Sequence, residues 1–187
     1  MIKISEVLKQ EKLLFLHSLN KTGALDSEER GLDERIINIL EDRVKLFSAC
    51  SIDLNEKNLE TYVFGTFGVG FTEGEISRAS NSDMGYLKEN ENVTMQKYPE
   101  INSVQQFMKT MRNRVNENNE ILVRNTQVSY LYVINQLYNI EGSDVLDLAK
   151  KFHLPLYYLK NNKYLKMMYP ESIEVNIDYV NSFNLKR

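Results

Sequence analysis

Apolar residues recur at three- and four-residue steps along much of the chain, a period that predicts a mostly helical protein. Ser5, Asp33, and either Asn102 or Ser103 are expected to cap helices. The helices are expected over residues 6–19, 33–48, 102–116 and 127–138. We expect the first two to pack as an antiparallel hairpin. For the last, aromatic and β-branched residues leave a strand as the open alternative.

Other stretches have the composition of strands. The sequence LETYVFGTFGVGF at 59–71 predicts a strand at 61–64, followed by a glycine-rich turn or a second strand. Alternating apolar and polar residues at 172–180 predict a strand with one solvated face. Weaker signals are a strand at 93–98, a strand or helix lead-in at 121–123, and a short helix beginning near Ser82.

The stretch from Gly142 to Met168 is the most specific unit in the sequence. Ser143 is expected to cap a first helix, Phe152 and Leu154 frame a turn, and Pro155 suits the first turn of a second helix. With a helix before it and a strand after it, the order resembles that of a winged-helix domain. The resemblance covers the last third of the chain and implies a helix-turn-helix-like module.

These patterns together predict an α+β protein that is mostly helical. We expect an N-terminal part, residues 1–120, of helices with a small β-sheet. We expect residues 121–187 to form the winged-helix-like module.

Charge and composition exclude several classes of function. The net charge of −3 gives no global footprint for nucleic acid. Cys50 is the only cysteine, and the two histidines are His17 and His153. An intramolecular disulfide is therefore impossible, and an ordinary structural zinc site lacks ligands. No stretch is apolar and long enough to span a bilayer, and the charged N-terminus is not a signal peptide. We expect a cytoplasmic protein.

Motifs for catalysis and cofactors are incomplete. Gly65 and Gly70 have the separation of a phosphate loop, but no lysine follows Gly70. Gly65-Thr66 with Ser82-Asp83 resembles the nucleotidyltransferase pattern, but the second acid is missing after Asp83. No nucleophile signature surrounds Cys50 or any serine. We therefore assign no catalytic residue, no metal and no cofactor, and lean away from an enzyme.

A local basic patch suggests a binding role instead. Residues 150–166 contain five lysines and no acid. Lysine contacts phosphate, and asparagine reads adenine edges in the major groove. The residues expected to contact nucleic acid are Lys150, Lys151, Tyr157, Lys160, Asn161, Asn162, Lys163 and Lys166.

The leading hypothesis is a non-enzymatic intracellular regulator or accessory factor that binds DNA or a partner protein through the C-terminal module. One alternative is a protein-binding inhibitor or assembly factor of the kind that phages and mobile elements encode. Another is a degenerate nucleotidyltransferase-like enzyme that uses the region from Gly65 to Asp83.

Overall fold

The structure is a computed structural model of residues 1–187. It describes residues 1–19, 34–43, 45–53, 67–81, 99–112, 119–134, 138–161 and 164–183.

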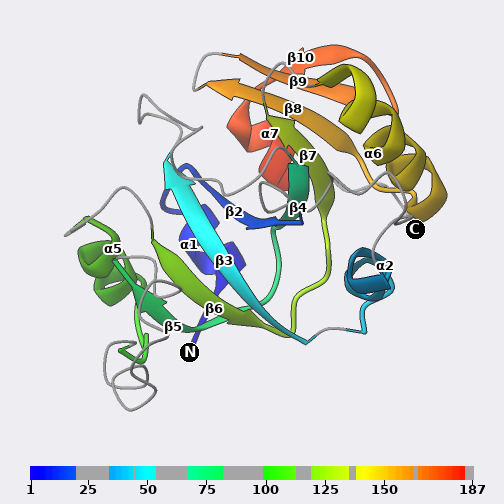
Figure 1. The fold of residues 1–187 in the computed structure, drawn as a ribbon. Coiled ribbons are helices and arrows are strands. Elements are labelled where there is room, and N and C mark those ends of the chain that lie inside the picture. Colours follow the sequence, from blue (N-terminus) through cyan, green and yellow to red (C-terminus); the bar gives the residue numbers. More distant parts are fainter. Residues whose placement is uncertain are drawn as a thin grey trace.

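A mixed sheet of ten strands dominates the molecule, in the order β1-β5-β6-β3-β2-β4-β7-β8-β9-β10 (Figure 1). Every neighbouring pair is antiparallel except β7 with β8. The strands are β1 Ile2–Lys3, β2 Leu13–Ser18, β3 Leu46–Asp53, β4 Phe67–Phe71, β5 Glu75–Ser80, β6 Glu120–Arg124, β7 Tyr130–Ile134, β8 Leu156–Asn161, β9 Tyr164–Tyr169 and β10 Ile173–Val175. The helices are α1 Ile4–Leu8, α2 Glu34–Leu40, α5 Val104–Arg112, α6 Tyr138–Phe152 and α7 Ile177–Ser182.

Strand β3 joins the two halves of the sheet, and Figure 1 shows it running diagonally between them. Its first half pairs with β6, up to Ala49 opposite Ile121, and its second half pairs with β2. The buried side chain of Asn119 extends the β6 side of this ladder. It accepts from the Ser51 amide and donates to the Ser51 carbonyl, both at 2.8 Å. A side chain thus satisfies backbone groups where the strand changes partners.

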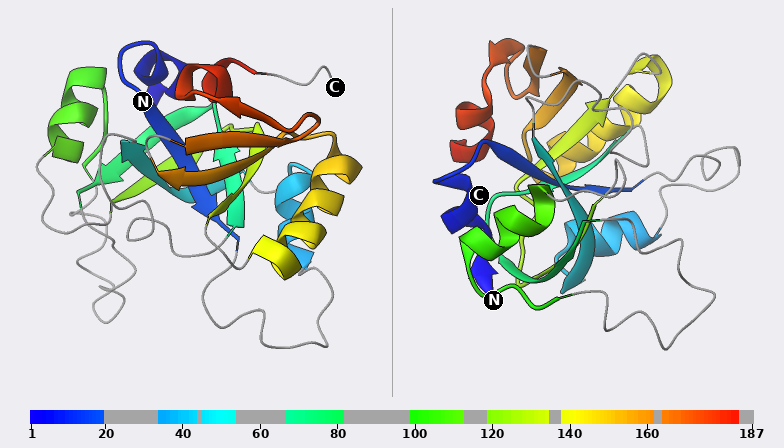
Figure 2. Two further views of the ribbon diagram at one scale, coloured as in Figure 1. Left: turned by 90° about the horizontal axis from the view of Figure 1, so that it is seen from above. Right: turned by 90° about the vertical axis from the view of Figure 1, so that its left-hand side faces the viewer.

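The sheet is buried on both faces around β2, where all four residues from Leu13 to Leu16 are buried. Leu13 and Phe15 face a core shared with α1, α2, α5 and α6, in which the Phe15 and Phe107 rings lie 6.0 Å apart. Leu14 and Leu16 face a second core, which α7 covers with Ile177 and Val180. The right panel of Figure 2 shows α6 and α7 on opposite sides of the strands.

Helix α6 connects the parallel strands β7 and β8. The amide of His153 donates to the Lys150 carbonyl at 3.3 Å, and that of Leu154 donates to the Ala149 carbonyl at 2.9 Å. This is the pattern of a Schellman motif, with His153 in the left-handed region at φ 52°. The motif ends the helix and directs the chain into β8.

The prediction of a mostly helical fold is wrong. In the described part of the chain a ten-stranded mixed sheet predominates, and the five helices are short. Much of the helix expected over 6–19 is strand β2, and the end of the one expected over 33–48 is strand β3. These segments do pair antiparallel, but as strands. The helix expected over 127–138 is strand β7, as its open alternative proposed.

The winged-helix-like module is also contradicted. Its first helix exists as α6, but residues 156–161, expected to begin the second helix, form strand β8. Pairing of β8 with β7 on one side and with β9 on the other overrides the local helical spacing of its leucines. The segment 172–180 is a strand only over β10, and then becomes helix α7.

Other predictions are confirmed. The second strand of the glycine-rich segment is β4, the strand reading of 121–123 is β6, and Ser103 accepts from the Gln106 amide ahead of helix α5. The elements expected at 61–64, near Ser82 and at 93–98 lie outside the described residues. Hydrogen-bonded strands join the segments on either side of residue 120, and the division into two domains stays a prediction.

Candidate functional site

The candidate site is the end of the sheet formed by edge strand β10 and helix α7. Ile173, Glu174 and Val175 alternate between apolar and charged, so their side chains point to opposite faces. Asn176 then ends the strand, because its side chain accepts from the Tyr179 amide at 2.9 Å and caps α7.

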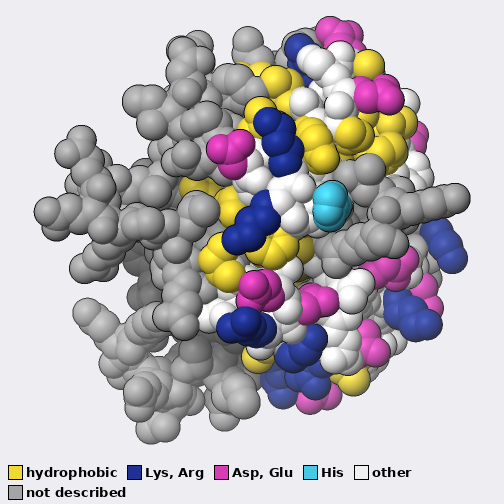
Figure 3. All heavy atoms as spheres, turned by 90° about the vertical axis from the view of Figure 1, so that its right-hand side faces the viewer, with side chains coloured by type: hydrophobic (Ala, Val, Ile, Leu, Met, Phe, Trp, Pro, Cys, Tyr) yellow, Lys and Arg dark blue, Asp and Glu magenta, His cyan; other side chains and the backbone are white. Residues whose placement is uncertain are grey.

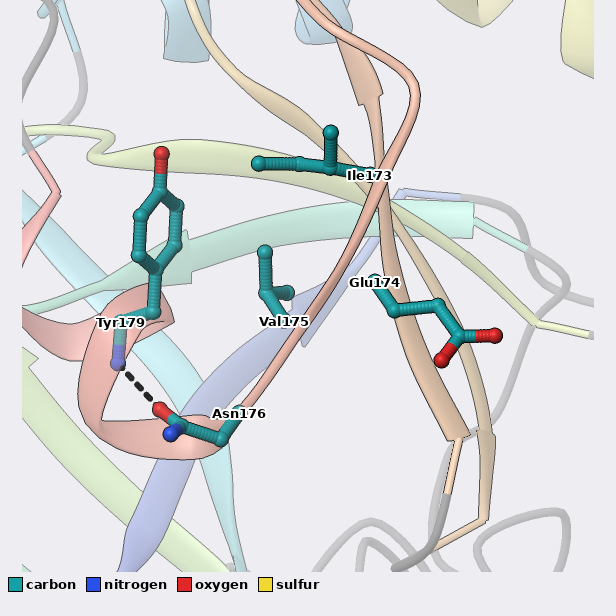
Figure 4. A pocket seen from close by; sticks show the side chains of 5 residues that line it. All are labelled: Ile173, Glu174, Val175, Asn176 and Tyr179. Carbon is teal, nitrogen blue, oxygen red and sulfur yellow. Dashed lines mark hydrogen bonds between the residues drawn. The ribbon is translucent and has the colours of Figure 1, made fainter.

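A pocket of about 350 Å³ lies where β10 meets α7. Figure 4 shows Ile173 and Val175 on the side of the strand that faces Tyr179, while Glu174 points away from them. The Tyr179 and Phe183 rings stack with centroids 5.1 Å apart. Ile173 is 38% exposed, and its pocket neighbours Val175 and Tyr179 are partly buried against the second core.

Helix α7 is held in place by polar contacts with β2 and the residues before it. The Asn181 side-chain amide donates to the Leu13 carbonyl at 3.0 Å. Lys12 forms an ion pair with Asp178 at 3.0 Å, but both side chains are mostly exposed, so the pair adds little stability. The Asn181 contact therefore does more to fix one wall of the pocket.

A layer of tyrosines lies in the second core, farther in from the edge. Tyr130 and Tyr132 on β7 lie opposite Gly70 and Gly68 on β4. A Cβ at Gly70 would fall 2.0 Å from the Tyr130 ring, so the ring occupies the space that a side chain would need. Tyr157 on β8 meets the Tyr130 ring edge-on, with centroids 5.4 Å apart.

These tyrosines hold their hydroxyl groups away from water. Burial raises the pKa of the Tyr130 hydroxyl well above its usual value, and the nearby Tyr157, Tyr132 and Cys50 raise it further. Burial also raises the pKa of Tyr132 and of Tyr157. Within the described part of the chain, the hydroxyls of Tyr130 and Tyr157 have no hydrogen-bond partner. The layer therefore acts as packing and stays neutral at physiological pH.

The surface around β10 is acidic. Glu171, Glu174 and Asp178 are exposed on or beside the strand and α7. Lys166 on β9 lies directly opposite Glu174 in the strand register. The outer edge of β10 thus presents a negative charge between two apolar side chains.

The residues predicted to contact nucleic acid do not form one helical surface. Lys150 and Lys151 are exposed in the last turn of α6, and Lys166 is half-buried on β9. Lys160 and Asn161 belong to strand β8, while Asn162 and Lys163 lie outside the described residues.

Tyr157 requires a correction, because its side chain is fully buried in the second core and cannot contact a sugar-phosphate backbone. Side chains alternate between the two faces along β8, and Tyr157 lies on the face of the second core. On the face drawn in Figure 3, the described basic side chains are interspersed with acidic and hydrophobic ones.

The candidates for catalysis are also separated. Cys50 lies opposite Leu16 and its thiol donates to the Leu16 carbonyl at 3.5 Å, on the face of the second core. His17, the next residue of β2, lies opposite Val69 and points to the other face. His153 is exposed beyond the end of α6. Gly70 is part of buried strand β4, while Gly65, Thr66, Ser82 and Asp83 lie outside the described residues.

The tyrosine layer was not predicted, although the sequence carries a signal for it. The glycines of FGVGF and the tyrosines of YLY both recur at every second residue. Matching two-residue periods of small and large side chains are typical of neighbouring strands that pack one into the other.

A scan against protein-family models finds no match, and a search of the curated proteins finds none either. Helix α6, the longest in the described residues, has 15 residues, and no described helix is both long and apolar enough to cross a membrane.

Proposed function

We propose that this chain is a non-enzymatic accessory protein that binds a partner protein through β10 and α7. The single observation that carries the proposal is the continuity of the second core with an exposed sheet edge. The second core extends to Val175 and Tyr179, and the 38% exposed Ile173 lines the same pocket as these two residues at the edge of the sheet. Partner strands commonly bind at such edges.

A comparison with the other exposed apolar residue within a described strand, Leu46 at 53%, supports this choice. Leu46 and Ile173 both lie outside the two core clusters, but Ile173 lines a pocket together with Val175 and Tyr179, which pack against the second core. An isolated exposed leucine is ordinary in a folded protein, but an apolar face beside a pocket is typical of binding surfaces.

A DNA-binding role no longer has the helix-turn-helix module on which it depended, so the partner-protein reading is preferred. We include a cytoplasmic location in the proposal, because Cys50 is the only cysteine and the chain therefore needs no oxidising compartment to form an intramolecular disulfide.

Site-specific photocrosslinking tests the proposal. A photoreactive amino acid is placed at position 173, and at position 46 as a matched control, in the cells that encode the chain. We expect a discrete crosslinked protein from position 173 that is absent from position 46. Equal crosslinking at both positions, or none at 173, would refute the proposal. A DNA-retention assay at two salt concentrations tests the other reading, since phosphate contacts weaken steeply with salt.

A further inference from the structure

Strand β10 pairs with β9 along one edge, and this pairing shows which side chains suit a neighbouring strand on its other edge. The register of β10 with β9 is Ile173 with Met167, Glu174 with Lys166 and Val175 with Leu165. The inner neighbour of β10 is therefore an apolar–basic–apolar triplet. The side chains of a strand contact those of the strands on both sides of it, so a strand added at the outer edge of β10 would face the same three side chains as β9 does.

We propose that the partner binds as an added strand on β10 and contributes an apolar–basic–apolar triplet, with its Lys or Arg opposite Glu174. This inference rests on the proposed function and names the chemistry of its partner. The apolar residues of the triplet extend the face of Ile173 and Val175 over the pocket beside Tyr179. The basic residue continues a cross-strand row that already runs from Tyr158 through Lys166 to Glu174.

Charge argues against a second copy of β10 as the occupant. An antiparallel β10–β10 pair centred on the strand would place Glu174 opposite Glu174, and like charges directly opposite are destabilising. In addition, no stretch of sequence that lies outside the described residues contains an apolar–basic–apolar triplet.

Peptide titrations monitored by NMR test this chemistry on the full chain. The probes are the peptides STVKVTS and STVEVTS, which differ only in the central charge. We expect STVKVTS to shift the backbone amides of residues 173–175 and to bind about fivefold more tightly than STVEVTS, which is about 1 kcal/mol.

Charge-swapped chains provide the control. Glu174→Lys is expected to reverse the preference and Glu174→Gln to abolish it, because the side chain is exposed and the substitution leaves the core intact. Glu171→Lys makes the same charge change outside the β9–β10 register, and we expect it to retain the preference for STVKVTS.

The inference would be overturned by equal affinity of both peptides for the unaltered chain, or by a reversal of the preference in Glu171→Lys like that in Glu174→Lys. Amide shifts that map away from β10 would do so too. A specific crosslink at position 173 with no peptide charge preference would reject the strand chemistry while the proposed function survives. Failure of both would reject both.

Discussion

The packing of Tyr130 over Gly70 makes a quantitative prediction about strand β4. In Gly70→Ala the new Cβ would lie 2.0 Å from the ring of Tyr130, where an ordinary contact is about 3.5–4.0 Å. The ring cannot swing aside, because it is buried and Tyr157 packs against it edge-on. We expect Gly70→Ala to lower the free energy of unfolding by about 3 kcal/mol.

Removing the ring should remove the clash. Tyr130→Ala alone is expected to cost about 4 kcal/mol. Independent effects in the double variant would total about 7 kcal/mol. However, the three nearest atoms to the added Cβ at Gly70 all belong to Tyr130, so the double variant should cost about as much as Tyr130→Ala alone. The coupling energy is then about 3 kcal/mol.

Gly68 provides a control with the opposite outcome. A Cβ there would fall 2.2 Å from the carbonyl oxygen of His17, which is backbone, as well as 2.6 Å from the Tyr132 hydroxyl. Tyr132→Ala should therefore fail to rescue Gly68→Ala. Urea unfolding followed by circular dichroism measures all six variants. Rescue at both glycines, or at neither, would refute the packing argument.

Four further outcomes are expected in the same assay. Tyr130→Phe and Tyr157→Phe each remove a buried hydroxyl without a described partner, and each should raise the free energy of unfolding by about 1 kcal/mol. Tyr132→Phe should not, because the Tyr132 hydroxyl lies 3.5 Å from the Ser18 hydroxyl. Burial raises the folded-state pKa of all three tyrosines, so their contribution to the free energy of unfolding is complete below about pH 10. Above that pH the unfolded chain ionises first, and the free energy of unfolding should fall by up to about 1.4 kcal/mol per pH unit for each tyrosine. A free energy of unfolding that does not change with alkaline pH would contradict this. His153→Gly should stabilise the chain by about 1 kcal/mol by relieving the left-handed backbone, and a loss would show that its side chain matters more. Asn119→Ala should cost about 2 kcal/mol, since two backbone groups of β3 lose their partner; an unchanged urea midpoint would argue against that role.

Elements with one solvated face were predictable from the sequence. Helix α5 buries Val104, Phe107 and Met111 and exposes the opposite side, so its period is visible. Strand β10 alternates because one of its faces meets water and the other meets the core.

Strands buried on both faces were not predictable in the same way. In β2 the run LLFL is apolar at every position, because the two cores take alternate residues. Such a run has no two-residue period, and its leucines match helical spacing equally well. What makes it a strand is pairing with β3 and β4, which come later in the chain.

The candidate site likewise has features that were predictable from the sequence and features that were not. The strand character and the charge of Glu174 are visible in the sequence. Its position at the last strand of the sheet depends on the order of strands, which pairing between distant segments decides. The nucleic-acid site was predicted on the neighbouring segment, residues 150–166, because a local run of lysines is apparent in the sequence without knowledge of the fold.

The place of β4 in the sheet also affects how the chain folds as it is synthesised. One neighbour, β2, is made before β4, but the other, β7, follows roughly 60 residues later. At about 5–20 residues per second, the ribosome needs about 3–12 s to supply it. During that interval β4 can pair with β2 but its other edge lacks its native neighbour, so this half of the sheet closes only after YLYVI has been synthesised.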